Sequence, residues 1–293
     1  MYWRAVPGAP PAAHSKNMSL TPYAFPEIHT AAKLGLLDDL HGNLRFTIEA
    51  FASFKALGVS CIVQLGDFGF VWPEPKSGRN LDRLSKALGE REMALYFVDG
   101  NHEGFDRLTR YPIAPDGTRV IRADIRHLPR GYRTTLVDGR SVAVLGGAGS
   151  VDRAYREPGK SWWSAEAIAE SDIVALGTDH ADVLLSHEAP SPLPAIDAAL
   201  AGSGFPIEDV VYAETVRAML TKGFMAVRPG LVFHGHHHVF HNSTEMFGVG
   251  ENTFESRVIG LDRDLPKRPS LAVLDVKNNG IRFYTSAGDP VGE

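Results

Sequence analysis

The sequence predicts an α/β fold with two packed β-sheets and helices on the outside. From Ala31 onward, short apolar runs of strand length alternate with longer segments that carry apolar residues at helical spacing, which is typical of α/β architecture. Beyond Asn101 this alternation gives way to short strand-like runs separated by turn residues. Neither an internal repeat nor a linker interrupts the pattern. We therefore expect a single domain over residues 31–293.

The first part of this domain is predicted to be a βαβαβ unit. Residues 43–57 form its first helix, because Leu44, Ile48 and Phe51 repeat on one helical face and Gly58 follows as a stop signal. A second helix is expected at residues 79–88. The three strands of the unit are expected at residues 33–37, 60–65 and 94–98.

The second part is predicted to consist mainly of short strands. Asp138-Gly139 lies between two apolar runs and predicts a hairpin turn, and Asn278-Asn279-Gly280 predicts another near the end of the chain. Helices are expected at residues 164–176 and 207–222. The strands are expected at residues 125–128, 133–137, 141–145, 182–186, 231–233, 253–259, 271–276 and 281–284.

The composition is that of an ordinary globular protein, with 44% hydrophobic and 22% charged residues. The formal net charge of -5 argues against broad binding to nucleic acid or to a membrane surface, although a local basic cleft is compatible with it. No run approaches the roughly 18–20 apolar residues that a membrane span requires. We therefore expect no membrane partner.

The N-terminal segment and the single cysteine bear on the location of the protein. Residues 1–30 are rich in Pro and Ala, lack periodicity and have no apolar stretch behind Arg4, so we expect an irregular extension and no secretory signal. Cys61 lies in an apolar run, where a buried thiol is expected. A single cysteine excludes an intramolecular disulfide and fits a reducing compartment. These observations favour the cytoplasm.

Five of the apolar runs end in residue types that bind metal ions. The runs are followed in turn by Asp39 and His41, by Asp67, by Asn101 and His102, by His187, and by His236 to His238. The carboxyl ends of the strands in an α/β sheet border one crevice, so these side chains are expected to converge. Each motif alone is more typical of a turn or a capped helix. Their repeated occurrence at strand ends predicts a metal site.

In this order the motifs resemble those of the calcineurin-like metallophosphoesterases, including members from phages and bacteria. The segments that match the family pattern are Asp39-Leu40-His41, Gly66-Asp67, Gly100-Asn101-His102-Glu103, His187 and Gly235-His236-His237-His238. The resemblance covers the chain from Ala31 to its end. It implies an α/β/β/α sandwich with two mixed β-sheets, and a centre of two divalent metal ions.

The resemblance also implies the ligands of each metal ion. The first ion would be bound by Asp39, His41, Asp67 and His238, and the second by Asp67, Asn101, His187 and His236, with Asp67 as the bridge. Two such cations can orient a phosphoryl group and turn a water molecule into hydroxide near neutral pH. Imidazole, carboxylate and amide ligands suit manganese, iron or zinc better than calcium. We expect manganese to support activity.

His102 follows the ligand Asn101 but is not a ligand in the family. We expect it to protonate the leaving oxygen or to stabilise charge on the phosphoryl group. Glu103 either orients the His102 ring or lies at a helix N-terminus. His237 is excluded from the ligands, because in an extended segment its side chain points away from those of its neighbours. For His234 a core position is preferred to a hydrogen bond with a ligand.

The segment from Gly146 to Glu166 is the most distinctive part of the chain outside these motifs. Arg153 and Arg156 stand beside aromatic residues there, and they are candidates for binding a substrate phosphate. The alternative, which is preferred, is that they form ion pairs with Asp152 or Glu157. After Asp67 the chain lacks both the Val-Asp-Arg-Gly continuation of Ser/Thr protein phosphatases and the Tyr ligand of purple acid phosphatases. Both subfamilies are therefore disfavoured.

Three functions agree with the sequence. The preferred one is hydrolysis of a phosphomonoester or phosphodiester bond in a phosphorylated small molecule or nucleotide. A nuclease acting on DNA or RNA requires a basic groove that the acidic net charge does not indicate. A noncatalytic interaction module on the same scaffold usually lacks ligands or the catalytic histidine, and this chain has all of them. The sequence therefore favours an enzyme.

Overall fold

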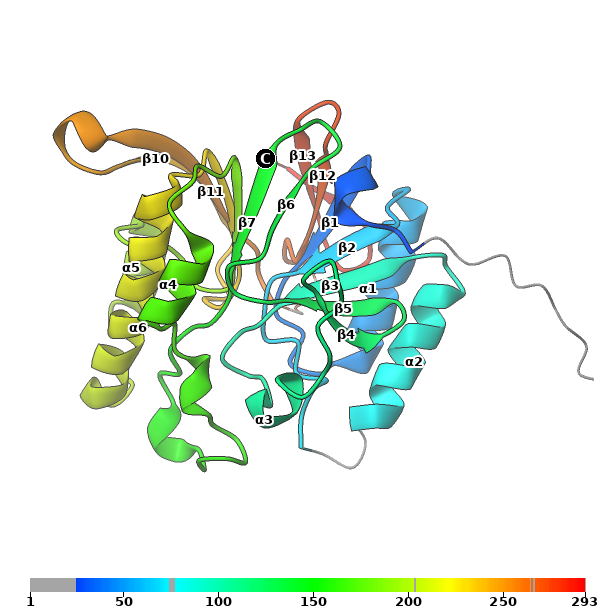
Figure 1. Ribbon diagram of the computed structural model, residues 1–293, viewed down its shortest axis with the longest axis horizontal. Coiled ribbons are helices and arrows are strands. Elements are labelled where there is room, and N and C mark those ends of the chain that lie inside the picture. Colours follow the sequence, from blue (N-terminus) through cyan, green and yellow to red (C-terminus); the bar gives the residue numbers. More distant parts are fainter. Residues whose placement is uncertain (1–24, 74–76, 203, 264, 266, 293) are drawn as a thin grey trace, which may run out of the picture.

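Two β-sheets lie at the centre of the structure, and helices cover the outer side of each (Figure 1). The computed structural model describes residues 25–73, 77–202, 204–263, 265 and 267–292. Of the described strands, eight form one sheet and six form the other. The predicted α/β fold, with two mixed sheets flanked by helices, is confirmed.

The eight-stranded sheet is built on the N-terminal βαβαβ unit. Strands β1 (Lys33–Leu37), β2 (Cys61–Gln64) and β3 (Ala94–Val98) are parallel neighbours, joined by helices α1 (Leu44–Ala56) and α2 (Ser77–Gly89). The predicted unit is thus confirmed. The sheet has the order β14-β13-β12-β1-β2-β3-β5-β4. Its other strands are β4 (Arg119–Arg122), β5 (Ile125–Leu128), β12 (Leu271–Asp275), β13 (Gly280–Tyr284) and β14 (Pro290–Val291).

The six-stranded sheet has the order β10-β11-β9-β8-β7-β6. Its four inner strands are parallel, whereas β6 and β10 pair antiparallel at the two edges. A turn that contains Asp138-Gly139 connects β6 to β7, and residues 276–279 connect β12 to β13, in agreement with the two predicted turns. The strands are β6 (Arg133–Thr135), β7 (Ser141–Leu145), β8 (Val183–Ser186), β9 (Leu231–His234), β10 (His241–Phe247) and β11 (Phe254–Gly260).

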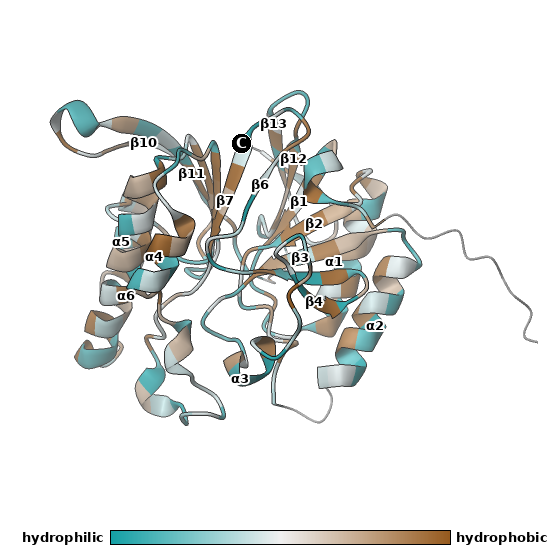
Figure 2. Ribbon diagram, in the orientation of Figure 1, coloured by the Kyte–Doolittle hydropathy of each residue, from teal (hydrophilic) through white to brown (hydrophobic). Residues whose placement is uncertain are grey.

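Three clusters of buried apolar side chains separate the layers. One lies between the eight-stranded sheet and helices α1 and α2 and includes Phe51 and Leu95. A second lies between the two sheets, and a third packs the six-stranded sheet against α4 (Glu170–Leu176), α5 (Pro194–Leu200) and α6 (Ile207–Val227). Both faces of the central strands are therefore buried, which explains their continuous apolar runs. In Figure 2 these strands are largely brown, whereas the outer helices carry teal residues.

The predicted helix over residues 164–176 is wrong in its extent. The structure has a 3₁₀ turn at Ser164–Glu166 and then α4, with extended backbone at Ala167 and Ala169 between them. Arg130 accounts for the break, because its guanidinium donates to the carbonyl oxygens of Ala165, Glu166 and Ala167. Those oxygens would otherwise accept the hydrogen bonds of a continuing helix.

Several short elements were not predicted. They are α3 (Phe105–Leu108), α5, β4, β10 and β14, together with the 3₁₀ turns at Ile28–Thr30, Arg153–Tyr155 and Gly250–Asn252. Strand β10 carries mostly polar residues because it lies in a hairpin that projects from the molecule, the orange element in Figure 1. Among its seven residues only His241 and Phe247, at the two ends, are buried, so the strand shows no apolar alternation.

The N-terminal boundary of the expected domain falls within the described residues. Residues 1–24 of the predicted extension lie outside the part that the structure describes. Ile28 is buried in the cluster between the two sheets, and Phe25 packs against Tyr96 with ring centroids 5.4 Å apart. Among the described residues, no helix has the length and apolar character that would let it cross a membrane.

Candidate metal centre

The predicted metal-binding side chains meet at the carboxyl ends of five strands. Asp39 and His41 follow β1, Asp67 follows β2, Asn101 follows β3, His187 follows β8, and His236 and His238 follow β9. A cavity lies over them, and its lining includes His41, Asp67, Asn101, His102, His236 and His238. Asp39 and His187 have no exposed surface. These side chains therefore converge at the carboxyl ends of the strands of both sheets, as expected from the positions of the motifs.

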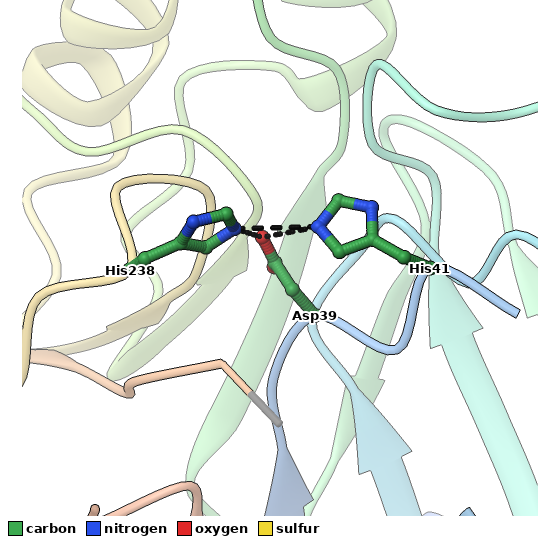
Figure 3. Close-up of side chains that lie close together, drawn as sticks. All are labelled: Asp39, His41 and His238. Carbon is green, nitrogen blue, oxygen red and sulfur yellow. Dashed lines mark hydrogen bonds and ion pairs between the residues drawn. The ribbon is translucent and has the colours of Figure 1, made fainter. Parts of the chain in front are cut away.

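Asp39, His41 and His238 form one group of possible ligands (Figure 3). The Asp39 Oδ2 atom lies 2.7 Å from Nε2 of His238 and 3.7 Å from Nε2 of His41. The two imidazole Nε2 atoms are 3.3 Å apart. Two ring nitrogens that face each other beside a buried carboxylate suit a shared cation, which would take a lone pair from each.

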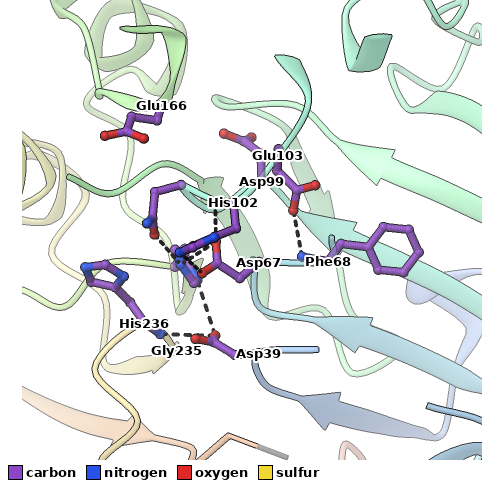
Figure 4. A network of polar contacts seen from close by, with 12 residues as sticks. Asp39, Asp67, Phe68, Asp99, His102, Glu103, Glu166, Gly235 and His236 are labelled. Atoms are coloured by element: carbon purple, nitrogen blue, oxygen red, sulfur yellow. Dashed lines mark hydrogen bonds and ion pairs between the residues drawn. The ribbon is translucent and has the colours of Figure 1, made fainter. Parts of the chain in front are cut away.

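Asp67 belongs to one group of possible ligands with His41 and His102 and to another with Asp39 and His187. Figure 4 shows it next to His102. Its backbone has φ 51°, and its carbonyl oxygen accepts hydrogen bonds from the N–H groups of Leu40 and His41. Its Oδ1 accepts the backbone N–H of His102 at 2.6 Å, while Oδ2 lies 3.7 Å from Nδ1 of His41. The loops after β1, β2 and β3 are therefore joined through this single residue.

His187 is oriented so that one ring nitrogen faces the centre. Its Nδ1 donates to the carbonyl oxygen of Leu65 at 2.8 Å, which leaves Nε2 as the unprotonated nitrogen of the neutral ring. Nε2 lies 3.3 Å from Asp67 Oδ1 and 3.3 Å from the amide oxygen of Asn101. A backbone carbonyl that fixes the tautomer in this way is a common feature of metal-binding histidines.

Two glycines permit this close approach. Gly66 has φ 113°, and a Cβ atom there would collide with the His187 ring. A Cβ atom on Gly100 would collide with Asp67 Oδ1 and lie 2.7 Å from His187 Nε2. The glycines of both motifs are thus needed because the side chains at the centre occupy the space beside their Cα atoms.

The segment after β9 is not extended, contrary to the expectation on which His237 was set aside. His236 and His238 have φ of 70° and 53°. The His236 amide donates to Asp39 Oδ1 at 3.2 Å, and its Nε2 lies 3.6 Å from Glu188 Oε2. His237 Nε2 lies 2.6 Å from Glu188 Oε1. Glu188, His236 and His237 therefore form a second group beside the central one.

His102 and Arg156 lie in contact on the wall of the cavity. Arg156 Nη2 donates to His102 Nε2 at 2.6 Å, since a guanidinium group can only donate. Arg156 also forms an ion pair with Asp152, with Nε 2.8 Å from Oδ1. His102 Nε2 is 3.8 Å from Asp67 Oδ2. Burial lowers the pKa of His102, the Arg156 charge lowers it further, and the Asp67 charge opposes both.

Arg153 lies apart from the cavity wall that Arg156 helps to form. Its Nε is 3.2 Å from Oδ1 of Asp209, which is buried, and its guanidinium lies 4.3 Å from the centre of the Tyr212 ring. Both arginines are thus engaged in ion pairs within the protein. Of the two, the structure brings Arg156 next to the predicted catalytic histidine.

Glu103 and His234 have structural contacts. Glu103 Oε1 accepts the backbone N–H of Phe68 at 2.6 Å (Figure 4), which ties the loop after β3 to the loop after β2. Burial raises the pKa of this carboxyl well above its usual range. His234 is fully buried, with Nε2 2.7 Å from Nε2 of His241, which agrees with the preferred core position.

The electrostatics of the site favour cations. Burial by itself would raise the pKa of Asp67, but the His102, His187 and His41 rings outweigh it and hold that pKa well below its usual range. Burial lowers the pKa of His187, but the carboxylates of Asp67 and Asp39 raise it to about 10. A divalent cation at Nε2 of His187 would therefore replace a proton that the same carboxylates attract.

Three residues near the centre were missed by sequence reasoning. Ser150 Oγ accepts the amide N–H of Asn101 at 3.1 Å and donates to Glu166 Oε2 at 2.7 Å. Glu188 directly follows His187 and contacts both His236 and His237. Glu188 could have been found as a carboxylate beside a predicted ligand. Ser150 and Glu166 carry no such signal, because only the fold brings them to Asn101.

Comparisons with known proteins agree with this architecture. A model of the calcineurin-like phosphoesterase family matches residues 34–240. The crystal structure of TT1561 of Thermus thermophilus is similar, with a TM-score of 0.50 and 17% sequence identity over 87% of this chain and 98% of that one. A dimetal phosphatase from Danio rerio is also similar, with a TM-score of 0.51 and 13% identity over 91% of this chain and 98% of that one. No curated protein sequence matches the chain.

Proposed function

Because the chain belongs to the calcineurin-like phosphoesterase family and is a hydrolase of phosphoric esters, we propose that it cleaves phosphomonoester or phosphodiester bonds with a centre of two divalent metal ions. The observation that carries this proposal is the position of Asp67. Its carboxylate lies among His41, His102 and His187, so one side chain touches both halves of the predicted ligand set.

The proposed ligands follow the two halves of the site. The first ion is held by Asp39, His41 and His238 together with Asp67, and possible ligand atoms of the first three lie within 4.8 Å of one another. The second is held by Asn101, His187 and His236, again with Asp67. The buried carboxylates and the neutral imidazole nitrogens suit manganese, iron or zinc. We propose manganese as the ion that supports activity.

When bound, two such cations polarise a phosphoryl group and make a water molecule more acidic. The protein's own residues supply the remaining steps. Asn101 and His187 keep their oxygen and nitrogen atoms aimed at the centre. Arg156 turns from His102 to a phosphoryl oxygen when substrate binds, and its pairing with Asp152 limits its movement. His102 is then free to carry a proton to the leaving oxygen.

Arg153 has a positioning part in this proposal. Its contact with Asp209, and the hydrogen bond from the Ala154 amide to the same carboxylate at 2.9 Å, hold the loop that carries Arg156 against α6. Residues 31–293 carry all of the proposed groups, and we propose that this part is the catalytic domain. We also propose that the protein acts in the cytoplasm. Its free, buried Cys61 thiol is compatible with a reducing compartment.

The experiment is hydrolysis of bis-p-nitrophenyl phosphate and p-nitrophenyl phosphate by metal-stripped protein with manganese added back. We expect turnover that requires manganese and that Asp67→Asn abolishes. If folded wild-type protein with bound manganese cleaves neither ester, the proposed hydrolysis is refuted for these two ester classes. The noncatalytic module then becomes the better explanation of the fold.

A further inference from the structure

Two cavities meet at the proposed centre. His41 and His102 belong to the walls of both. The larger cavity has a volume of about 290 Å³ and is also lined by Asp67 and Asn101. The smaller has a volume of about 210 Å³ and extends past Gly42. A phosphorus atom bound at the centre would therefore have room for a substituent in each.

The larger cavity has an apolar wall. Val151 from the loop after β7, Leu200 at the end of α5, and Phe205, Val210 and Ala213 around the start of α6 line it. Phe205 is 43% exposed. An apolar surface beside a charged centre holds a substituent that gains by leaving water.

The smaller cavity is more polar. Its lining combines the backbone at Gly42 and Gly69 with Ser77, Asn80 and the rings of Phe70 and Trp72. A Cβ atom on Gly69 would lie 2.7 Å from the carbonyl carbon of His41, so the two loops touch and form the floor. Asn80 is half-buried, and its amide forms no hydrogen bond with the described residues. It can therefore donate to or accept from a ligand.

The charges of the two linings favour a substrate with one negative charge. Among the described residues of both linings the cationic side chains, histidines apart, are Arg156 and Arg217, and each is paired with a carboxylate. Arg217 Nη1 lies 2.9 Å from Asp197 Oδ1. Beyond these two pairs, Glu188 and Glu214 add negative charge to the larger cavity. A phosphomonoester brings two charges near neutral pH and a phosphodiester brings one, so the diester meets less repulsion.

We propose that the substrate is a phosphodiester, with an apolar substituent in the larger cavity and a more polar one in the smaller. This inference rests on the proposed phosphoesterase function and adds the class of substrate. Hydrolysis forms a P–O bond to a water oxygen and breaks the P–O bond to one substituent. The water loses one proton and the leaving oxygen gains one, so the products are a phosphomonoester and an alcohol.

The test compares one variant in each cavity on the two nitrophenyl esters, with manganese bound. Val210→Thr places a hydroxyl in the apolar wall, and Asn80→Ala removes the half-buried amide from the smaller cavity. Wild-type protein should have a kcat/KM for bis-p-nitrophenyl phosphate at least about tenfold above that for p-nitrophenyl phosphate. Each variant should lower kcat/KM for the diester about three- to tenfold. At most one of them should lower it for the monoester, which has a single substituent.

Matched controls come from neighbouring residues outside the two linings. Val211→Thr alters an exposed valine of the same helix, and Arg79→Ala alters an exposed residue next to Asn80. Both should keep wild-type kinetics. Three results would overturn the diester inference and leave the phosphoesterase function in place. They are a preference for the monoester, a diester rate that neither cavity variant changes, and equal losses on both esters. Failure of wild-type protein to cleave either ester would overturn both.

Discussion

The side-chain amide of Asn101 donates to the Ser150 hydroxyl at 3.1 Å. That hydroxyl in turn donates to the Glu166 carboxylate at 2.7 Å, and the Tyr212 hydroxyl donates to the same carboxylate at 3.0 Å. Because the Asn101 nitrogen is engaged with Ser150, its oxygen must face the centre, where it lies 3.3 Å from His187 Nε2. A chain of hydrogen bonds from α6 therefore sets the orientation of one proposed ligand.

Ser150→Ala should weaken binding of the second metal ion. Without the hydroxyl the Asn101 amide can rotate, and loss of such a supporting contact typically costs about 10- to 100-fold in metal affinity. Manganese titration by calorimetry measures the change. Ser164→Ala, at an exposed serine nearby, is the control. An unchanged affinity would show that Ser150 does not orient Asn101.

His102→Ala should lower kcat by about 10² to 10⁴ fold while both metal ions stay bound. The reason is that the proposed proton donor is lost, but no proposed ligand is. Metal content and single-turnover rates, measured on the same samples, separate loss of the proton donor from loss of a metal ion. His180→Ala, at an exposed histidine, is the control. His102 also lies within reach of His41 and Asp67 as a potential ligand. Loss of a metal ion in the variant would therefore assign His102 to the metal centre.

Asp67→Asn should weaken both metal ions together, because this carboxylate is the proposed bridge. The variant keeps the size of the side chain. It also keeps one oxygen atom, which can accept the hydrogen bond from the His102 amide. Metal stoichiometry after dialysis should fall from two toward zero, and circular dichroism should show that the variant is folded. Loss of a single ion, with the other still tightly bound, would rule out the bridge.

Gly100→Ala should abolish metal binding and shift the backbone after β2. The added methyl group would collide with Asp67 Oδ1 and with the Asp67 backbone nitrogen, and it would lie 2.7 Å from His187 Nε2. Gly280→Ala is a suitable control, since a Cβ atom there meets open space. Metal analysis and circular dichroism of the two variants give the comparison. Normal metal content in Gly100→Ala would mean that the two side chains can move apart at little cost.

The sequence predicted the fold best where both faces of a strand are buried. Strands β1 and β3 agree with the prediction residue by residue, because continuous apolar runs with sharp ends define them. The prediction failed where contacts with residues distant in the sequence determine the backbone conformation. Arg130 breaks the expected helix at residues 167–169, and the sequence of that segment contains no residue that predicts the break. Strand β10 was missed because its residues are polar and pair in an exposed hairpin.

For the site, the motifs placed the side chains but not their surroundings. Every residue of the proposed ligand set lies at the centre, since each follows a strand end. By contrast, the positive φ angles of His236 and His238, and with them the contact of His237 with Glu188, depend on the local backbone. The apolar wall by α6 likewise depends on how helices pack, which motif spacing does not encode.

Cys61 provides a test of the core that does not involve the metal centre. Burial in β2 raises the pKa of its thiol, and no surface of the residue is exposed. A group whose pKa is raised by folding contributes stability that is lost as the pH rises above its unfolded value of about 8.5. The free energy of unfolding should therefore fall by up to about 1.4 kcal/mol per pH unit above that value. Urea titrations at pH 8 and 9.5 should show this fall in wild-type protein and a smaller one in Cys61→Ala. Equal slopes, or fast reaction of the native thiol with a disulfide reagent at pH 8, would mean that β2 opens readily.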